Sequence, residues 1–97
     1  MSNKNRFKSV WDALEDTPEQ AENMKLRSAL MMALQKRITQ LKLTQEKAAE
    51  LLHVTQPRVS DLMRGKINLF ALDVLVNMAI AAGLQVKMNI TEMKKAA

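Results

Sequence analysis

The stretch from residue 44 to residue 66 constrains the fold most, because it holds two helix starts separated by one short helix. Thr44 is placed to cap a helix over Gln45–Leu52, and Thr55 is placed to cap a second helix over Gln56–Arg64. A threonine at such a position accepts a hydrogen bond from a backbone N–H group that the first helical turn leaves unpaired. Residues 53–55 form the break, so the sequence predicts two short helices joined by a tight turn.

The second of these helices has an apolar side and a polar side. Val59, Leu62 and Met63 are expected to point inward together with Val54 from the turn, and Ala49 leaves room where the two helices cross. The opposite side carries Gln56, Pro57, Ser60, Asp61 and Arg64. Polar side chains on the free side of such a helix are typical of a recognition helix, which enters the major groove of DNA.

Residue type indicates what each polar side chain in this region could contact on DNA. Gln56, in the first helical turn, can present a donor and an acceptor to adenine. The positively charged Arg58 and Arg64 can reach phosphate or guanine. Hydrogen bonds to phosphate are expected from Gln45, Thr55 and Ser60, and contacts to the flanking backbone from Lys66 and Asn68.

A long helix is predicted before this motif. Thr17, Pro18 and Gln20 form a capping box with proline in the first turn. The helical pattern then runs to about Leu41. Its apolar stripe consists of Leu26, Leu30, Ala33, Leu34, Ile38 and Leu41.

Two elements are predicted after the motif. A core helix, roughly Leu69–Ala82, begins at Asn68 or a neighbour and ends at Gly83. The residues that follow alternate strictly between apolar and polar, which predicts a strand. Its apolar members, Leu84, Val86, Met88 and Ile90, are candidates for a dimer contact, because a lone strand needs a partner for its backbone.

We therefore expect an all-α fold: a lambda repressor-like domain of five helices with a helix-turn-helix at 44–66, plus a short C-terminal β-strand. The domain would span residues 10–91. It would follow a flexible tail at 1–9, begin with a short helix over Val10–Glu15, and precede a tail at 92–97.

Composition narrows the function. Residues 1–24 carry three basic and five acidic side chains, a balance of −2, whereas residues 25–97 carry twelve basic and five acidic, a balance of +7. A basic body suits a polyanion such as nucleic acid. The chain has no cysteine, one histidine and two glycines. We therefore expect no metal site, no cofactor and no enzymatic activity, and the absence of a signal or membrane segment predicts a cytoplasmic protein.

The segment TQEKAAELLHVTQPRVSDLMRGKIN resembles the helix-turn-helix of the xenobiotic-response-element (XRE) family, which is related to Cro and repressor proteins. The stretches SVWDALEDTPEQAENMKLRSAL and INLFALDVLVNMAIAAGLQV are similar to the HigA-type antitoxins within that family, and such a relative suggests a bacterial or phage origin. In the family, positions equivalent to Gln45, Gln56, Pro57, Ser60 and Asp61 lie at or near DNA. One departure is His53, where the family favours glycine.

The resemblance implies a homodimer that binds an inverted repeat in double-stranded DNA and represses its own promoter. It also implies a partner, a small basic RelE- or HigB-like toxin. Such a toxin would suit the acidic arm around Trp11, Asp12, Glu15 and Asp16. Two simpler explanations stay open, since Trp11 could staple the first helix to the body and the acidic residues could form a solvated face. A repressor without a toxin, or an adaptor that has lost DNA binding, are the alternative functions.

Overall fold

The computed structural model describes residues 17–93. Within that range the chain forms four α-helices and one 3₁₀ turn. They are α3 (Pro18–Gln40), α4 (Gln45–Leu52), α5 (Gln56–Met63), η1 (Ile67–Leu69) and α6 (Leu72–Ala81). The short helix expected over Val10–Glu15 lies outside the described residues, so the expected count of five helices is not supported.

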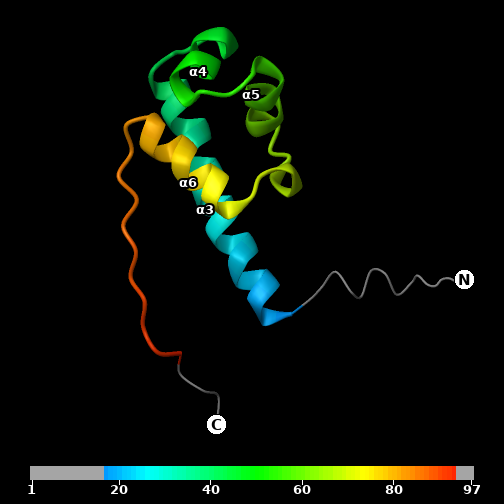
Figure 1. Cartoon of the computed structure of the whole chain (residues 1–97), viewed down its shortest axis with the longest axis vertical. Helices are drawn as coiled ribbons and strands as arrows, with labels where there is room; N and C mark the ends of the chain where they lie inside the picture. Colours follow the sequence, from blue (N-terminus) through cyan, green and yellow to red (C-terminus); the bar gives the residue numbers. More distant parts are fainter. Residues whose placement is uncertain (1–16, 94–97) are drawn as a thin grey trace, which may run out of the picture.

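Helix α3 is the longest element, and the other helices gather around its C-terminal half (Figure 1). Helix α6 packs along α3, whereas α4 and α5 pack mainly against each other at the far end of α3. The N-terminal turns of α3 project beyond this body, and residues 17–23 are exposed. None of these helices is both long and apolar enough to cross a membrane.

The three predicted helix starts are confirmed. The Thr17 side chain accepts a hydrogen bond of 3.0 Å from the Gln20 backbone, and the Gln20 side chain accepts one from the Thr17 backbone. Thr44 and Thr55 cap α4 and α5 through the backbone N–H groups of Lys47 and Arg58. These local bonds need no tertiary context, which is why the sequence alone predicts them.

All four described helices end in the same way. Each helix ends at a residue with a positive φ. This residue is the C-cap itself in α4 (His53) and the residue after the C-cap in the other three helices (Lys42, Gly65 and Gly83). In each case the next residue donates its backbone N–H to a carbonyl five residues earlier, as Val54 does to Ala49 at 3.0 Å. This is the Schellman motif, which pairs carbonyls that a helix end leaves free. Two of the four ends use glycine, the residue that adopts this conformation without steric cost.

The apolar core lies where the four helices meet. The largest fully buried side chains are Phe70, Leu34, Leu62, Leu75 and Val59. No polar or charged residue among residues 17–93 is buried. The predicted stripe of α3 is wrong in part, because Leu26 is 55% exposed and Ala33 and Leu41 are exposed. Leu34 and Ile38 are buried as predicted, Leu30 packs against the core, and Met31 is buried beside them, so the side of α3 that faces the core is narrower than the predicted stripe.

The region after α5 also differs from expectation. A 3₁₀ turn occupies Ile67–Leu69, and α6 begins at Leu72 rather than at Leu69. Phe70 lies between them in extended backbone and is 1% exposed, so burial of this ring separates two helical pieces that the apolar pattern had merged. The predicted strand over residues 84–90 is also wrong, because residues 84–93 contain no strand and run as an extended segment away from α6 (Figure 1). Leu84 donates its backbone N–H to the Ala79 carbonyl at 2.9 Å, a bond that closes the end of α6 and does not form a sheet.

Candidate nucleic-acid interface

Helices α4 and α5 form the predicted helix-turn-helix, and the turn between them starts at His53. His53 has φ 61° and ψ 43°, the left-handed conformation, and its side chain is exposed. The turn therefore has the geometry that glycine would adopt, although a histidine occupies it. Val54 follows and packs against the core, which fixes where the chain enters α5.

Helix α5 divides into a buried face and an exposed face as its sequence predicts. Val59 and Leu62 are fully buried, and Met63 packs against the core. Gln56 and Pro57 are exposed at the start of α5, and Arg64 is exposed at its end. Ser60 lies between them and is half-buried. The first turn of α5 is thus accessible to a ligand while the rest of the helix is anchored.

The hydroxyl of Thr55 has a structural role as well as a candidate contact. It accepts the cap bond from the Arg58 backbone, which leaves its own proton free to donate. Gln45 is exposed at the first position of α4. Two neighbouring helix starts therefore each present a hydrogen-bonding side chain toward solvent, which is the kind of group that contacts phosphate.

The segment after α5 carries exposed Arg64, Lys66 and Asn68. The ammonium of Lys66 lies 3.7 Å from a carboxylate oxygen of Asp61, whose side chain is only 25% exposed. The carboxylate and the ammonium thus partly neutralise each other on this surface. The backbone of Lys66 also donates to the Asp61 carbonyl at 3.0 Å, so the end of α5 and the following residues form one unit.

Arg58 is placed differently from the other predicted contact residues. Its guanidinium lies over the ring of Phe70, 4.2 Å from the ring centroid, and its Nη1 donates to the Leu69 carbonyl at 2.9 Å. Arg58 is half-buried as a result. Sequence patterns place arginine on a helix, but they do not reveal that a ring ten or more positions later will hold it.

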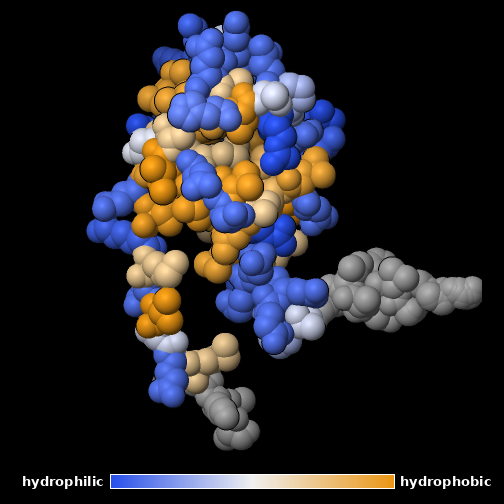
Figure 2. Space-filling view, in the orientation of Figure 1, coloured by the Kyte–Doolittle hydropathy of each residue, from blue (hydrophilic) through white to orange (hydrophobic). Residues whose placement is uncertain are grey.

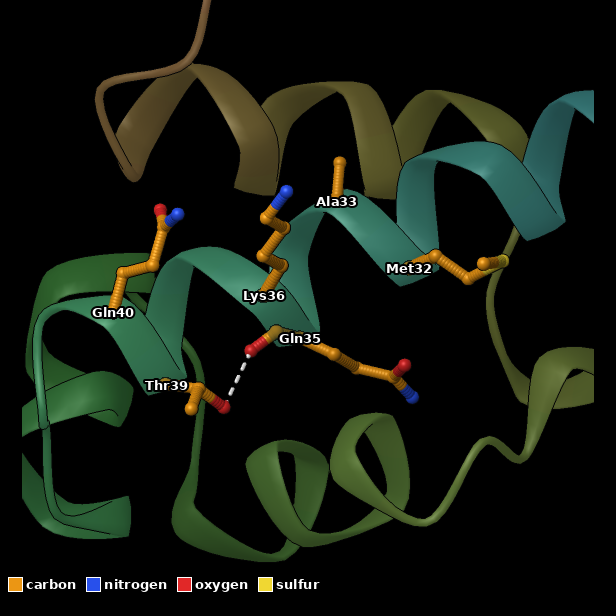
Figure 3. A pocket seen from close by; sticks show the side chains of 6 residues that line it. All are labelled: Met32, Ala33, Gln35, Lys36, Thr39 and Gln40. Atoms are coloured by element: carbon orange, nitrogen blue, oxygen red, sulfur yellow. Dashed lines mark hydrogen bonds between the residues drawn. The ribbon is translucent and has the colours of Figure 1, made fainter.

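The described residues offer little that resembles a small-molecule site. One hollow of about 500 Å³ runs along α3, and every residue lining it belongs to that helix (Figure 3). A second, of about 620 Å³, lies between the end of α3, α4 and Ala81, and like the first it is wide open to solvent. Figure 3 shows the Gln35 amide extending on the α5 side of α3, where it donates to the Leu62 carbonyl at 2.9 Å. A ligand pocket normally has walls from several elements and encloses most of its ligand. Among residues 17–93 no group of three His, Asp or Glu side chains could hold a metal ion.

The other candidate site residues fall in two places. Trp11, Asp12, Glu15 and Asp16 lie outside the described residues. The apolar residues of the C-terminal segment are accessible, with Met88 80% and Ile90 82% exposed, and Figure 2 shows hydrophobic and hydrophilic residues alternating along this segment. Leu84 is the exception, because it packs against the core directly after α6.

Comparison with known proteins agrees with this geometry. The family described as "Helix-turn-helix domain" matches residues 13–91, which is most of the chain. A solved structure, provisionally described as an XRE-family transcriptional regulator, shares 30% sequence identity with a TM-score of 0.73. The match covers 80% of this chain and 91% of that chain. No curated protein matches the sequence. Helix-turn-helix domains are a DNA-binding class rather than a catalytic one, and this chain belongs to the XRE family of helix-turn-helix proteins.

Proposed function

We propose that the chain is a sequence-specific DNA-binding transcriptional regulator in which α5 reads base edges in the major groove. The observation that carries this proposal is the division of α5 into a buried apolar face and an accessible first turn with Gln56 at its start. A glutamine amide can pair with adenine through both a donor and an acceptor. The exposed Arg64 and Lys66 supply positive charge beside it.

Salt-dependent binding tests this function. A preferred duplex is first selected from a random pool with the full chain, and affinity is then measured across a salt series for that duplex and for a scrambled one. We expect affinity for both to fall steeply with salt, because binding releases counterions from phosphate. Arg64→Gln should flatten the dependence by about one unit of log–log slope, because Arg64 is exposed at the end of α5. Lys25→Gln, on the projecting part of α3, is the matched control and should leave the slope unchanged. DNA affinity that does not change with salt concentration would favour an adaptor that has lost DNA binding.

We also propose that the regulator acts as a homodimer through its C-terminal segment. Val86, Met88 and Ile90 alternate with polar residues along the extended backbone, and all three are exposed. Apolar side chains in such an arrangement gain free energy when a second copy covers them. A two-fold dimer would place two α5 helices about 34 Å apart, one turn of DNA, and so match an inverted repeat. A contact through α6, where Ile80 is 58% exposed, is the alternative interface.

The alternation itself provides a matched pair of variants. Serine at Val86, Met88 and Ile90 should give a monomer in sedimentation, whereas serine at Gln85, Lys87 and Asn89 should keep the dimer. Ile80→Ser separates the alternative, because it would break only a dimer formed through α6. A wild-type chain that sediments as a monomer at about tens of micromolar would refute dimerisation.

An antitoxin role is the finer proposal. It is supported by the similarity of the flanking sequence to HigA-type antitoxins and by the acidic cluster, which Glu19 and Glu22 continue as exposed residues on α3. An acidic surface suits a small basic RelE- or HigB-like toxin. The product of the neighbouring reading frame is the natural probe. Co-purification that Asp12→Asn with Glu15→Gln weakens, and Glu46→Gln on α4 does not, would support an antitoxin. A neighbour of another kind favours a repressor without a toxin.

A further inference from the structure

Arg58 connects the recognition helix to the segment that follows it. The guanidinium stacks on the Phe70 ring at 4.2 Å and donates to the Leu69 carbonyl at 2.9 Å. Phe70 is almost completely buried, so the ring cannot move without disturbing the core. Through these two contacts, Arg58 fixes α5 against the end of η1.

A second arginine, from another helix, contacts the same segment. Arg27 on α3 donates through Nη1 to the Ile67 carbonyl at 3.2 Å and to the Phe70 carbonyl at 3.4 Å. Its Nε donates to Asn23 at 2.7 Å, which orients the guanidinium. Residues 67–70 are therefore fixed to α3, and through Arg58 they provide a rigid support for α5.

The C-terminal end of α5 has its own anchor. Gln35 on α3 donates to the Leu62 carbonyl at 2.9 Å. Arg58 and Gln35 thus hold α5 at two points along its length, one near its first turn and one in its last. Helix α5 can tilt about the Gln35 contact only if the Arg58 contacts break.

We infer that Arg58 is a positioning residue that sets the angle of α5 for base reading, and that it is not a phosphate ligand. The inference rests on the proposed DNA-binding function. A planar guanidinium can stack on a ring while donating at its edge, and a lysine ammonium cannot do both in this geometry. One face of the guanidinium and one of its five N–H groups are committed to these partners, so Arg58 can turn outward to a more distant phosphate only by leaving them.

Charge-conserving and charge-removing variants separate the two roles. Arg58→Lys keeps the positive charge but loses the stacked, in-plane geometry. If Arg58 positions α5, this variant loses about tenfold in the ratio of specific to non-specific affinity, while non-specific affinity and its salt slope stay at wild-type values. Arg58→Gln then behaves in the same way. If Arg58 binds phosphate, Arg58→Lys resembles wild type, and Arg58→Gln weakens binding to both duplexes and reduces the slope by about one.

A spectroscopic measurement on the unchanged protein avoids any problem of folding. The Phe70 ring current shifts the side-chain proton resonances of Arg58. Persistence of that shift in the DNA complex supports the positioning role, and its loss on binding overturns it.

A double variant of Arg58 and Phe70 tests the stacked pair by protein unfolding alone, without any DNA. Coupling between Arg58→Gln and Phe70→Leu of roughly two- to five-fold in the unfolding equilibrium constant is expected if the stacked pair exists. Absence of coupling overturns the inference that Arg58 holds α5 through Phe70. A wild-type chain that binds no DNA overturns only the proposed function.

Discussion

Arg37 in the last turn of α3 donates a hydrogen bond of 2.9 Å from its Nε to the carbonyl oxygen of Ala82 at the end of α6. Ala82 is buried, so water cannot replace this donor easily. The guanidinium also lies at the negative end of the α6 dipole, where a cation is favoured. Gly83 follows, and a Cβ there would lie only 3.1 Å from Arg37 Nη2. One side chain thus joins the C-terminal end of α3 to the C-terminal end of α6.

Replacing Arg37 with methionine should destabilise the domain by about 1–3 kcal/mol, because the stem still packs but the buried carbonyl loses its charged partner. Urea unfolding measures this loss. Lys36→Met is the control, since Lys36 is exposed and makes no such bond, and its effect should stay within about 0.5 kcal/mol. Equal stability of the two variants would show that the Arg37 bond contributes nothing.

A substitution at His53, where α4 ends in the left-handed conformation, should raise the stability of the domain. His53→Gly should stabilise the domain by roughly 0.5–1 kcal/mol, because glycine adopts φ 61° without a Cβ clash and this gain exceeds its larger entropy in the unfolded chain. Glu50→Gly, at an exposed position inside α4, should instead destabilise by about 1 kcal/mol. Thermal melts of both variants provide the comparison. A destabilising His53→Gly would mean that the histidine side chain makes a favourable contact.

Gln56→Ala should lower affinity for the preferred duplex by about 1–3 kcal/mol and leave affinity for scrambled DNA nearly unchanged. The physical reason is that base contacts carry specificity and backbone contacts do not. Fluorescence anisotropy on both duplexes measures the difference. Gln40→Ala, on the exposed surface of α3, should alter neither. An equal loss on both duplexes would assign Gln56 to the DNA backbone.

Asp61→Asn should strengthen binding to scrambled DNA. The change removes a negative charge from the α5 surface and releases Lys66, now 3.7 Å from that carboxylate, for a phosphate. The log–log salt slope should become steeper by up to about 0.9, the value for one further phosphate contact. The control is Glu22→Gln, which removes a similar carboxylate paired with Lys25 at 3.1 Å on α3. If scrambled DNA binds Asp61→Asn no better, Lys66 does not contact phosphate.

The sequence predicts well whatever depends on neighbouring residues alone. The three threonine caps, the proline in the first turn of α3 and the glycines after α5 and α6 are local signals, and the structure confirms each of them. The polar face of α5 follows from helical periodicity, and its first-turn residues are indeed exposed. Their contacts with DNA remain predictions.

Features that depend on distant residues were harder to predict. Leu26 has the same apolar side chain as Leu34, and only the docking of the other helices on α3 decides that Leu34 is buried while Leu26 stays 55% exposed. The alternation over residues 84–90 has the period of a strand, but a strand also needs a partner, and residues 17–83 offer none. Arg58 carries the charge expected of a DNA ligand, while its real surroundings depend on a buried ring beyond the end of the helix.

The extended course of residues 85–93 separates the residues proposed to join two copies from the residues that stabilise the fold of one copy. These residues are exposed and lie outside the hydrophobic core. Substitutions here consequently leave the free energy with which one copy folds almost untouched. Substitutions at these positions can therefore alter the proposed pairing of two copies without altering the fold of the helical domain.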